Sequence, residues 1–272
     1  MKILFIGDIV GLSGRKVILD HLPGLRRQLG LDFVIANGEN AAHGFGITAK
    51  ICEDLYDSGV DVITSGNHMW DNKDIIPRMS DLPKLIRPLN FPPGTPGKGY
   101  DIFETKAGYR VGVINVMCRL FMDPMDDPFR GVQKALEAIE LKRDADAIVI
   151  DVHGEASSEK MAMGYFVDGR VSLVIGSHTH VPTADERILP KGTAYMTDAG
   201  MTGDYDSIIG MKKEVPIQKF LTKMPTERME PAIGPGTLCG VIVEIDDDTG
   251  FALSISPLRL GGVLKPAWPQ FS

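Results

Sequence analysis

Five short apolar runs in this chain each end at a residue that can bind a metal ion. The first run ends at Asp8, and the fifth leads into the sequence His178-Thr179-His180. The other three end at Glu39 with Asn40, at Asn67 with His68, and at His153. Carboxylate and amide oxygens with imidazole nitrogens form the mixed ligand set that suits Fe, Mn or Zn. Because ligands of open α/β sheets lie beyond the carboxyl ends of the strands, we expect these side chains to share one metal-binding pocket.

The His178-Thr179-His180 sequence is the most specific single motif. Alternate residues of an extended segment point to the same side, and two nearby metal ions could each take one imidazole. The same histidines could instead be hydrogen-bonded turn residues. Asp8 and Asn40 also have structural alternatives, as a turn residue and as a backbone cap. The prediction of metal binding therefore rests on the number of such strand ends rather than on one motif.

His68 differs from the other candidates because it also suits acid–base chemistry. Histidine titrates near neutral pH, so an imidazolium here could protonate a leaving group. The structural alternative is a turn residue stacked on Trp70. Glu155 could accept a hydrogen bond from an imidazole N–H, or it could be an exposed residue at the start of a helix. The remaining histidines, His21 and His43, are expected to be structural or exposed.

The composition is that of an ordinary soluble globular protein, with 272 residues, 43% hydrophobic and 24% charged. A net charge of −7 argues against a broad basic surface for long nucleic acid or membranes. Cys52, Cys118 and Cys239 form no CxxC pair and are expected to be reduced thiols. No apolar run approaches the ~18 residues that span a bilayer. These features predict a cytoplasmic protein.

The first part of the chain is expected to place the candidate residues at one edge of a sheet. Buried strands at residues 3–6, 32–36 and 60–64 alternate with helices, a pattern that predicts a parallel sheet wrapped by helices. The apolar spacing from Ile18 to Leu29 predicts the first helix, which Pro23 could kink or restart. Thr48 is expected to cap the second helix, and a short helix follows the third strand.

The second part of the chain follows a Pro- and Gly-rich connection at residues 88–99. We expect strands at 100–105, 110–116, 148–152, 171–175 and 193–197, helices at 130–143 and 156–166, and a C-terminal hairpin of 241–245 with 251–258. Residues 204–236 show no clear periodicity and are expected to form a flap or a subunit contact without regular structure. No linker divides the chain, so the prediction is one α/β domain over residues 1–272.

The order of these motifs resembles that of the calcineurin-like metallophosphoesterases, over nearly the whole chain. More narrowly it resembles their YmdB-type branch, and the segments that carry this likeness are Gly7–Gly11, Asn37–Ala42 and Thr197–Gly203. The chain departs from the broad superfamily in three places. The superfamily usually has the sequence Asp-x-His at the first site, but here Asp8 is followed by Ile9 and Val10. Glu39 stands where Asp is usual, and Met69 follows Asn67-His68 where an acidic residue is common. These departures favour the narrower branch and leave the metal identity open.

The resemblance implies a layered fold of central β-sheets flanked by helices, with a dinuclear metal site at the C-terminal ends of the strands. One divalent ion would bind Asp8, Glu39, Asn40 and His180, and the other would bind Glu39, Asn67, His153 and His178. Iron is the first expectation for both ions, with manganese or zinc as alternatives. Two divalent cations against two carboxylates leave about +2, or about +1 with a bridging hydroxide, which would attract a phosphodiester to an acidic protein.

The activity implied by the resemblance is hydrolysis of small phosphodiesters, including 2′,3′-cyclic nucleotides. A metal-bridging hydroxide would attack phosphorus, and His68 would be the proton donor to the leaving oxygen. The resemblance also suggests a homo-oligomer. Two alternatives stay open: a phosphomonoesterase or nuclease, and a regulatory interaction protein with residual phosphodiesterase activity.

Overall fold

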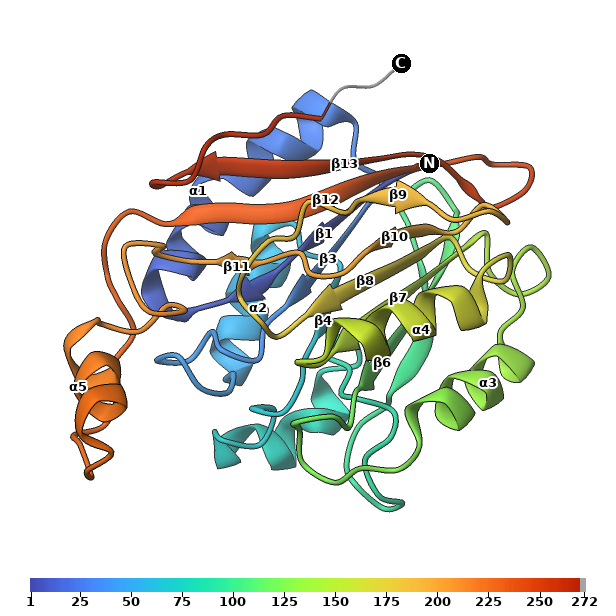
Figure 1. Cartoon of the computed structure of the whole chain (residues 1–272). Coiled ribbons are helices and arrows are strands. Elements are labelled where there is room, and N and C mark those ends of the chain that lie inside the picture. The colour runs from blue at the N-terminus through green and yellow to red at the C-terminus, as the bar shows by residue number, and fades with distance from the viewer. Residues whose placement is uncertain (270–272) are drawn as a thin grey trace.

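The computed structural model describes residues 1–269, whose strands form two mixed β-sheets and one small sheet (Figure 1). The first sheet contains, in order, β13 (Ala252–Gly261), β12 (Thr237–Ile245), β1 (Lys2–Ile6), β3 (Phe33–Asn37) and β4 (Val62–Thr64). The second contains β5 (Tyr100–Glu104), β6 (Arg110–Met117), β7 (Ala147–His153), β8 (Leu173–Ser177), β10 (Ala194–Met196) and β9 (Arg187–Ile188). The small sheet pairs β2 (Asp8–Ile9) with β11 (Met201–Thr202).

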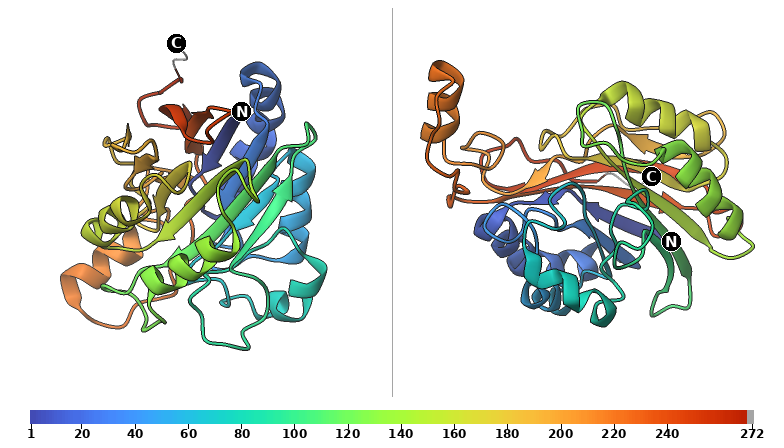
Figure 2. Two further views of the ribbon diagram at one scale, coloured as in Figure 1. Left: turned by 90° about the vertical axis from the view of Figure 1, so that its right-hand side faces the viewer. Right: turned by 90° about the horizontal axis from the view of Figure 1, so that it is seen from below.

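The two large sheets stack face to face and have helices on their outer faces, as the view from below in Figure 2 shows. Alternation along β1 explains the layers, because successive side chains of a strand point to opposite faces. Ile3 and Phe5 pack between the sheets, whereas Leu4 and Ile6 pack toward the helices. The first sheet is covered by α1 (Gly11–Leu29), α2 (Ala49–Ser58) and the 3-10 helix η1 (Lys73–Asp81). The second is covered by α3 (Pro128–Ala138) and α4 (Ser157–Val167).

The α/β prediction is confirmed, and most elements lie where the sequence pattern puts them. The Thr48 side chain accepts a hydrogen bond from the N–H of Ile51 and caps α2 as expected. Pro23 lies inside α1 without ending it. The predicted parallel sheet also contains an antiparallel pair, β12 with β1, and a second sheet packs against it, in agreement with the layered fold of central β-sheets that the resemblance implies. The helix predicted at 130–143 begins earlier, because Asp127 caps it and Pro128 suits its first position. It ends at Ala138, before the predicted end.

The prediction that residues 204–236 lack regular structure is wrong, because they contain the helix α5 (Glu214–Thr222). Pro216 is the one residue of this helix that is buried, so the helix has no apolar face turned toward a core and its periodicity is weak. In Figures 1 and 2 α5 projects from the body of the molecule. Within residues 1–269, no helix combines the length and the apolar character needed to cross a membrane.

Candidate metal centre

The predicted ligands converge because parallel strands of both sheets end at the same edge. β1, β3 and β4 are parallel neighbours in the first sheet, as are β7 and β8 in the second. Asp8 lies in β2 just after β1, and His153 is the last residue of β7. The other candidates, Glu39, Asn40, Asn67, His68, His178 and His180, follow the ends of β3, β4 and β8.

Four potential ligand atoms surround one point at this edge. His153 Nε2 lies 3.1 Å from Glu39 Oε1, 2.9 Å from Asn67 Oδ1 and 3.2 Å from His178 Nδ1. With metal–ligand bonds of about 2.1 Å, ligand atoms of one ion are roughly 3 Å apart, so this spacing suits a shared cation. Ligand atoms of Glu39, His153 and His178 all lie within 4.8 Å of one another, which makes the group a possible metal site.

Asp8, Asn40 and His180 form a second group of potential ligands. His180 Nε2 is 3.3 Å from Asn40 Oδ1. Asp8 is fully buried, and its Oδ1 has no hydrogen-bond partner among the described residues, while its Oδ2 accepts the N–H of His178 at 3.1 Å. The nearest cationic group to Asp8 Oδ1 is His153 Nδ1 at 3.9 Å, too far for a hydrogen bond. A buried carboxylate oxygen without a hydrogen bond is costly, and a bound cation would remove that cost. The donor set therefore fits a second ion next to the first.

The charges at the centre depend on one another. Burial is the main reason that the pKa of Asp8 lies well above its usual value, although nearby His153 acts in the other direction. Burial alone would raise the pKa of Glu39, but the His153 imidazole and the neighbouring His68 outweigh it and lower that pKa to about 2. Burial alone would lower the pKa of His153, but the carboxylates of Glu39 and Asp8 raise it to about 9. Cation binding would displace the protons that Asp8 and His153 hold.

The imidazoles are oriented by groups behind them. His153 Nδ1 lies 3.0 Å from the Ser177 hydroxyl, which donates to Asp151 Oδ1 at 2.6 Å, so Nε2 is the nitrogen that faces the ligand cluster. His178 presents Nδ1 to the cluster, and its Nε2 lies 3.4 Å from Glu155 Oε2. Burial and the nearby His153 lower the pKa of His178 to about 3, which favours the neutral imidazole that a metal requires. Such carboxylate–imidazole contacts commonly fix metal-binding histidines.

The buried pair of Lys160 and Asp198 has no counterpart among the functional residues predicted from the sequence. The Lys160 ammonium donates to Asp198 Oδ2 and to the Ser177 carbonyl, both at 2.7 Å. Asp198 Oδ2 also accepts the N–H of Thr179 at 3.1 Å. His178 and His180, on either side of Thr179, have φ values of 100° and 65°. The pair thus holds an unusual turn that directs both imidazoles to the centre. The Thr197–Gly203 segment contains Asp198 and was the available signal, whereas Lys160 on a helix resembles a surface residue.

Gly66 is required by the close approach of two ligands. A Cβ at this position would lie 2.3 Å from His153 Nε2 and 2.5 Å from Glu39 Oε2. Contacts this short do not occur, so any side chain at residue 66 would displace the ligands. The glycine before Asn67 is therefore part of the centre's geometry.

His68 lies at the rim of the cluster rather than inside it. Its backbone N–H donates to Glu39 Oε2 at 2.9 Å, and its Nδ1 lies 2.8 Å from Asp71 Oδ2. The ring packs edge to face against Phe45, with centroids 5.1 Å apart, and Trp70 packs against Phe91 instead. The histidines expected to be structural or exposed, His21 and His43, are both exposed.

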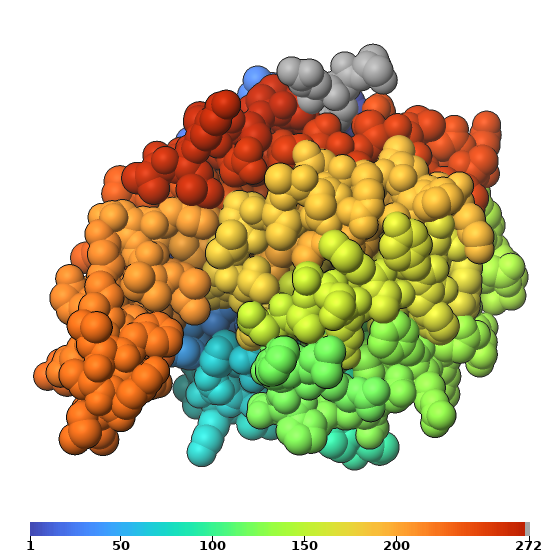
Figure 3. Space-filling view, viewed as in Figure 1, coloured from blue at the N-terminus to red at the C-terminus, as the bar shows by residue number. Residues whose placement is uncertain are grey.

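The centre opens into a cavity of about 880 Å³. Its floor includes Glu39, Asn40 and His178, and its far wall is formed by α5 and the residues after it. In Figure 3 a notch separates the orange α5 segment from the blue and cyan surface formed by early residues. The cavity has room for a small molecule beside the potential metal ligands.

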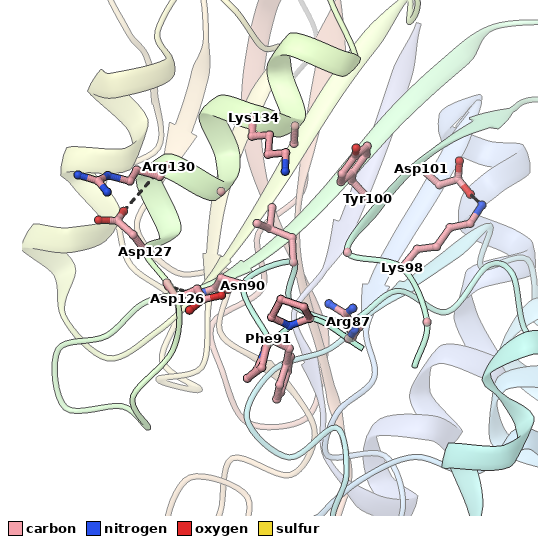
Figure 4. A pocket seen from close by; sticks show the side chains of 17 residues that line it. Arg87, Asn90, Phe91, Lys98, Tyr100, Asp101, Asp126, Asp127, Arg130 and Lys134 are labelled. Atoms are coloured by element: carbon pink, nitrogen blue, oxygen red, sulfur yellow. Dashed lines mark hydrogen bonds and ion pairs between the residues drawn. The ribbon is translucent and has the colours of Figure 1, made fainter. Parts of the chain in front are cut away.

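A second cavity of about 870 Å³ lies between α3 and the 87–101 segment (Figure 4). Most of its charged groups already have structural partners. Arg87 donates to the carbonyls of Pro88, Thr95 and Pro96, and Lys98 pairs with Asp101 at 2.5 Å. None of the candidate ligands lines this cavity. The chemistry therefore belongs to the first cavity.

Comparison with known proteins identifies the family of this chain. A family model described as YmdB-like protein matches residues 4–258. The chain belongs to the YmdB-like family. This YmdB-like chain is 52% identical over 261 residues to a protein of Bacillus subtilis (strain 168) named 2′,3′-cyclic-nucleotide 2′-phosphodiesterase, with 96% of this chain and 97% of the relative covered. The resemblance stated from the motifs is thereby confirmed.

Two solved structures share the fold of this YmdB-like chain. A hypothetical protein from Thermus thermophilus superposes with a TM-score of 0.89 at 43% identity, covering 96% of this chain and 100% of that one. A protein from Mycoplasma pneumoniae described as a novel phosphatase superposes with a TM-score of 0.88 at 35% identity, covering 96% of this chain and 93% of that one. The expectation that this chain is a phosphoric ester hydrolase agrees with the names of these relatives.

Proposed function

We propose that this YmdB-like chain is a dinuclear-metal phosphodiesterase that hydrolyses small phosphodiesters, with 2′,3′-cyclic nucleotides as the substrate class. The observation that carries the proposal is the convergence of Glu39, Asn67, His153 and His178 on one point beside a cavity of about 880 Å³. The Bacillus subtilis relative, named for this activity, supports the same substrate class.

Two overlapping ligand sets would hold the ions, and both include Glu39. The first set is Asp8, Glu39, Asn40 and His180, and the second is Glu39, Asn67, His153 and His178. Iron is the first candidate and manganese or zinc the alternatives, since mixed nitrogen and oxygen ligands accept each of them. When bound, divalent ions supply charge neutralisation for phosphoryl oxygens and acidify the attacking water.

The proton donor in this proposal is His68. Asp71 Oδ2 lies 2.8 Å from Nδ1, which fixes the ring and leaves Nε2 as the nitrogen available to substrate. The backbone contact between His68 and Glu39 keeps the ring next to the ligand cluster. A bound phosphodiester would therefore have its leaving oxygen within reach of a general acid.

The test is a panel of phosphate esters assayed with the purified chain and added Mn²⁺ or Fe²⁺, together with elemental analysis. We expect metal in the isolated protein and hydrolysis of 2′,3′-cyclic AMP. Faster turnover of phosphomonoesters would favour the phosphatase alternative, which is the activity named for the Mycoplasma pneumoniae structure. No turnover of any ester would overturn the proposal and favour the regulatory interaction protein.

The remaining parts of the proposal concern the whole chain. We propose one domain over residues 1–272, a cytoplasmic location and a homo-oligomeric state. Cys52, Cys118 and Cys239 are free and buried, as expected for a reducing compartment.

A further inference from the structure

One stripe of the α5 segment lines the cavity of the metal centre. The lining residues are Pro216, Lys219, Phe220, Lys223 and Met224. Pro216, Lys219 and Phe220 are three and four positions apart within α5, so they share the face that is turned toward the cavity, and Lys223 and Met224 directly follow the helix. Phe220 and Leu221 are adjacent and similarly exposed, at 70% and 80%, yet Leu221 does not line the cavity.

The lining of the same cavity is also apolar next to His68. Phe45 lines the cavity and packs edge to face against the His68 ring at 5.1 Å. Ile209, which is 56% exposed, lies on the same lining. A ligand that reached both the ligand cluster and α5 would thus have a polar end at the cluster and a flat or apolar end between Phe45 and Phe220.

The α5 wall also carries positive charge. Lys219 and Lys223 line the cavity, and Lys223 Nζ lies 5.3 Å above the centroid of the Phe220 ring. Within residues 1–269, neither lysine forms an ion pair with a carboxylate. In a chain with a net charge of −7, two such cations beside the cavity favour an anionic ligand.

We propose that Phe220, with Met224 beside it, binds the base of the nucleotide on the side of Phe45, while Lys219 and Lys223 add positive charge that attracts the anionic nucleotide to the cavity. The inference rests on the proposed function, because that function places the phosphate at the ligand cluster. His68 protonates the leaving ribose oxygen, and Phe45 contacts His68, so the nucleoside lies on the Phe45 side. Bases of any sequence have a face on which an aromatic ring can stack.

The experiment compares Phe220→Ala with Leu221→Ala on two substrates. One is 2′,3′-cyclic AMP, and the other is methyl riboside 2′,3′-cyclic phosphate, which has the same reacting group but no base. We expect Phe220→Ala to lower kcat/KM for 2′,3′-cyclic AMP by about 10-fold. The base-free substrate should be unaffected by Phe220→Ala, and Leu221→Ala should match the natural chain on both.

Two outcomes would overturn the assignment. One is an equal loss on both substrates, which would make Phe220 a structural residue. The other is an equal loss of kcat/KM in Phe220→Ala and Leu221→Ala together with a changed sedimentation coefficient of both variants. That result would show that a second copy of the chain covers α5.

Failure of the proposed function is recognised separately. If the natural chain hydrolyses neither substrate, the phosphodiesterase proposal is wrong, and calorimetry with adenosine 3′-monophosphate decides the base site. Weaker binding by Phe220→Ala alone would support the base site, and equal binding by both variants would overturn it.

Discussion

A methyl group on the α-carbon of Gly66 would lie 2.3 Å from Nε2 of His153, the atom that we propose as a metal ligand. Gly66 follows β4 of the first sheet and His153 ends β7 of the second, so their approach brings the candidate ligands of the two sheets together. The centre therefore depends on a residue that has no side chain.

Gly66→Ala should reduce the metal content of the purified protein. The new Cβ displaces His153 and Glu39, and a displacement of about 1 Å can cost about 100-fold in activity. Elemental analysis and turnover of 2′,3′-cyclic AMP measure both effects. Gly24→Ala is the matched control, since nothing lies within 4 Å of its Cβ and the helix α1 favours Ala. Normal metal content in Gly66→Ala would contradict the ligand geometry.

His68→Ala should lower turnover by about 10² to 10⁴-fold while the metal content stays largely intact. The ring lies at the rim of the cluster, and His68 belongs to neither proposed ligand set. His21→Ala, an exposed change in α1, serves as the control and should have normal turnover. Unchanged turnover in His68→Ala, or loss of its metals, would rule out the proton-donor role.

Glu39→Gln should lower metal occupancy, because Glu39 belongs to both proposed ligand sets. Its carboxylate supplies charge that an amide lacks, and we expect the metal bound per chain to fall to less than about half. The measurement is elemental analysis after dialysis. Glu53→Gln, on the exposed side of α2, should leave occupancy unchanged. Equal metal content in the two variants would argue against the shared ligand.

Lys160→Met should lower the free energy of unfolding by about 3 to 5 kcal/mol, because it leaves the Asp198 carboxylate buried without its cation. Urea denaturation measures the change. Lys50→Met is the control, since it removes an exposed ion pair with Asp54 at 2.8 Å and should leave the unfolding midpoint nearly unchanged. A similarly small effect of Lys160→Met would show that the buried pair does not stabilise the fold.

Asp185→Asn should destabilise the protein at neutral pH and less so in acid. Burial alone would raise the pKa of Asp185, but hydrogen bonds from Thr197 and Thr183 outweigh it and lower the pKa. A folded-state pKa below the unfolded value of about 3.9 stabilises the fold above that pH, and the stabilisation is lost as pH falls through the folded pKa.

Urea denaturation between pH 7 and pH 3 measures this difference. The gap in unfolding free energy between the natural chain and Asp185→Asn should shrink below about pH 4. The exposed change Asp248→Asn should show no such gap. A gap that is constant with pH would show that the Asp185 charge does not stabilise the fold.

Much of the centre could be predicted because strand ends are local features of the sequence. Apolar runs that stop at Asp8, Glu39 or His153 are visible without knowledge of the partner strand. The stacking of two sheets is not visible in this way, because both faces of β1 are apolar and the pattern does not say which element covers each face. The wrong prediction for residues 204–236 has a related cause, since α5 packs on little and has no core stripe to reveal it.

Lys160 illustrates another limit of the sequence. A lysine on a helix is normally exposed, and only the folded chain brings Asp198 close enough to bury it. The role of Gly66 could not be predicted either, because a glycine before Asn67 resembles an ordinary turn residue. Both depend on contacts between segments that are far apart in the chain.

The projection of α5 has a consequence for how such proteins can diverge. The helix carries the proposed base-binding face but buries only Pro216, so most of its positions are free of the constraints that fix the core. Substitutions there can accumulate without loss of folding or of the hydrolytic apparatus. Related chains can therefore acquire new preferences among nucleotides through changes in one short helix, while the inherited chemistry stays the same.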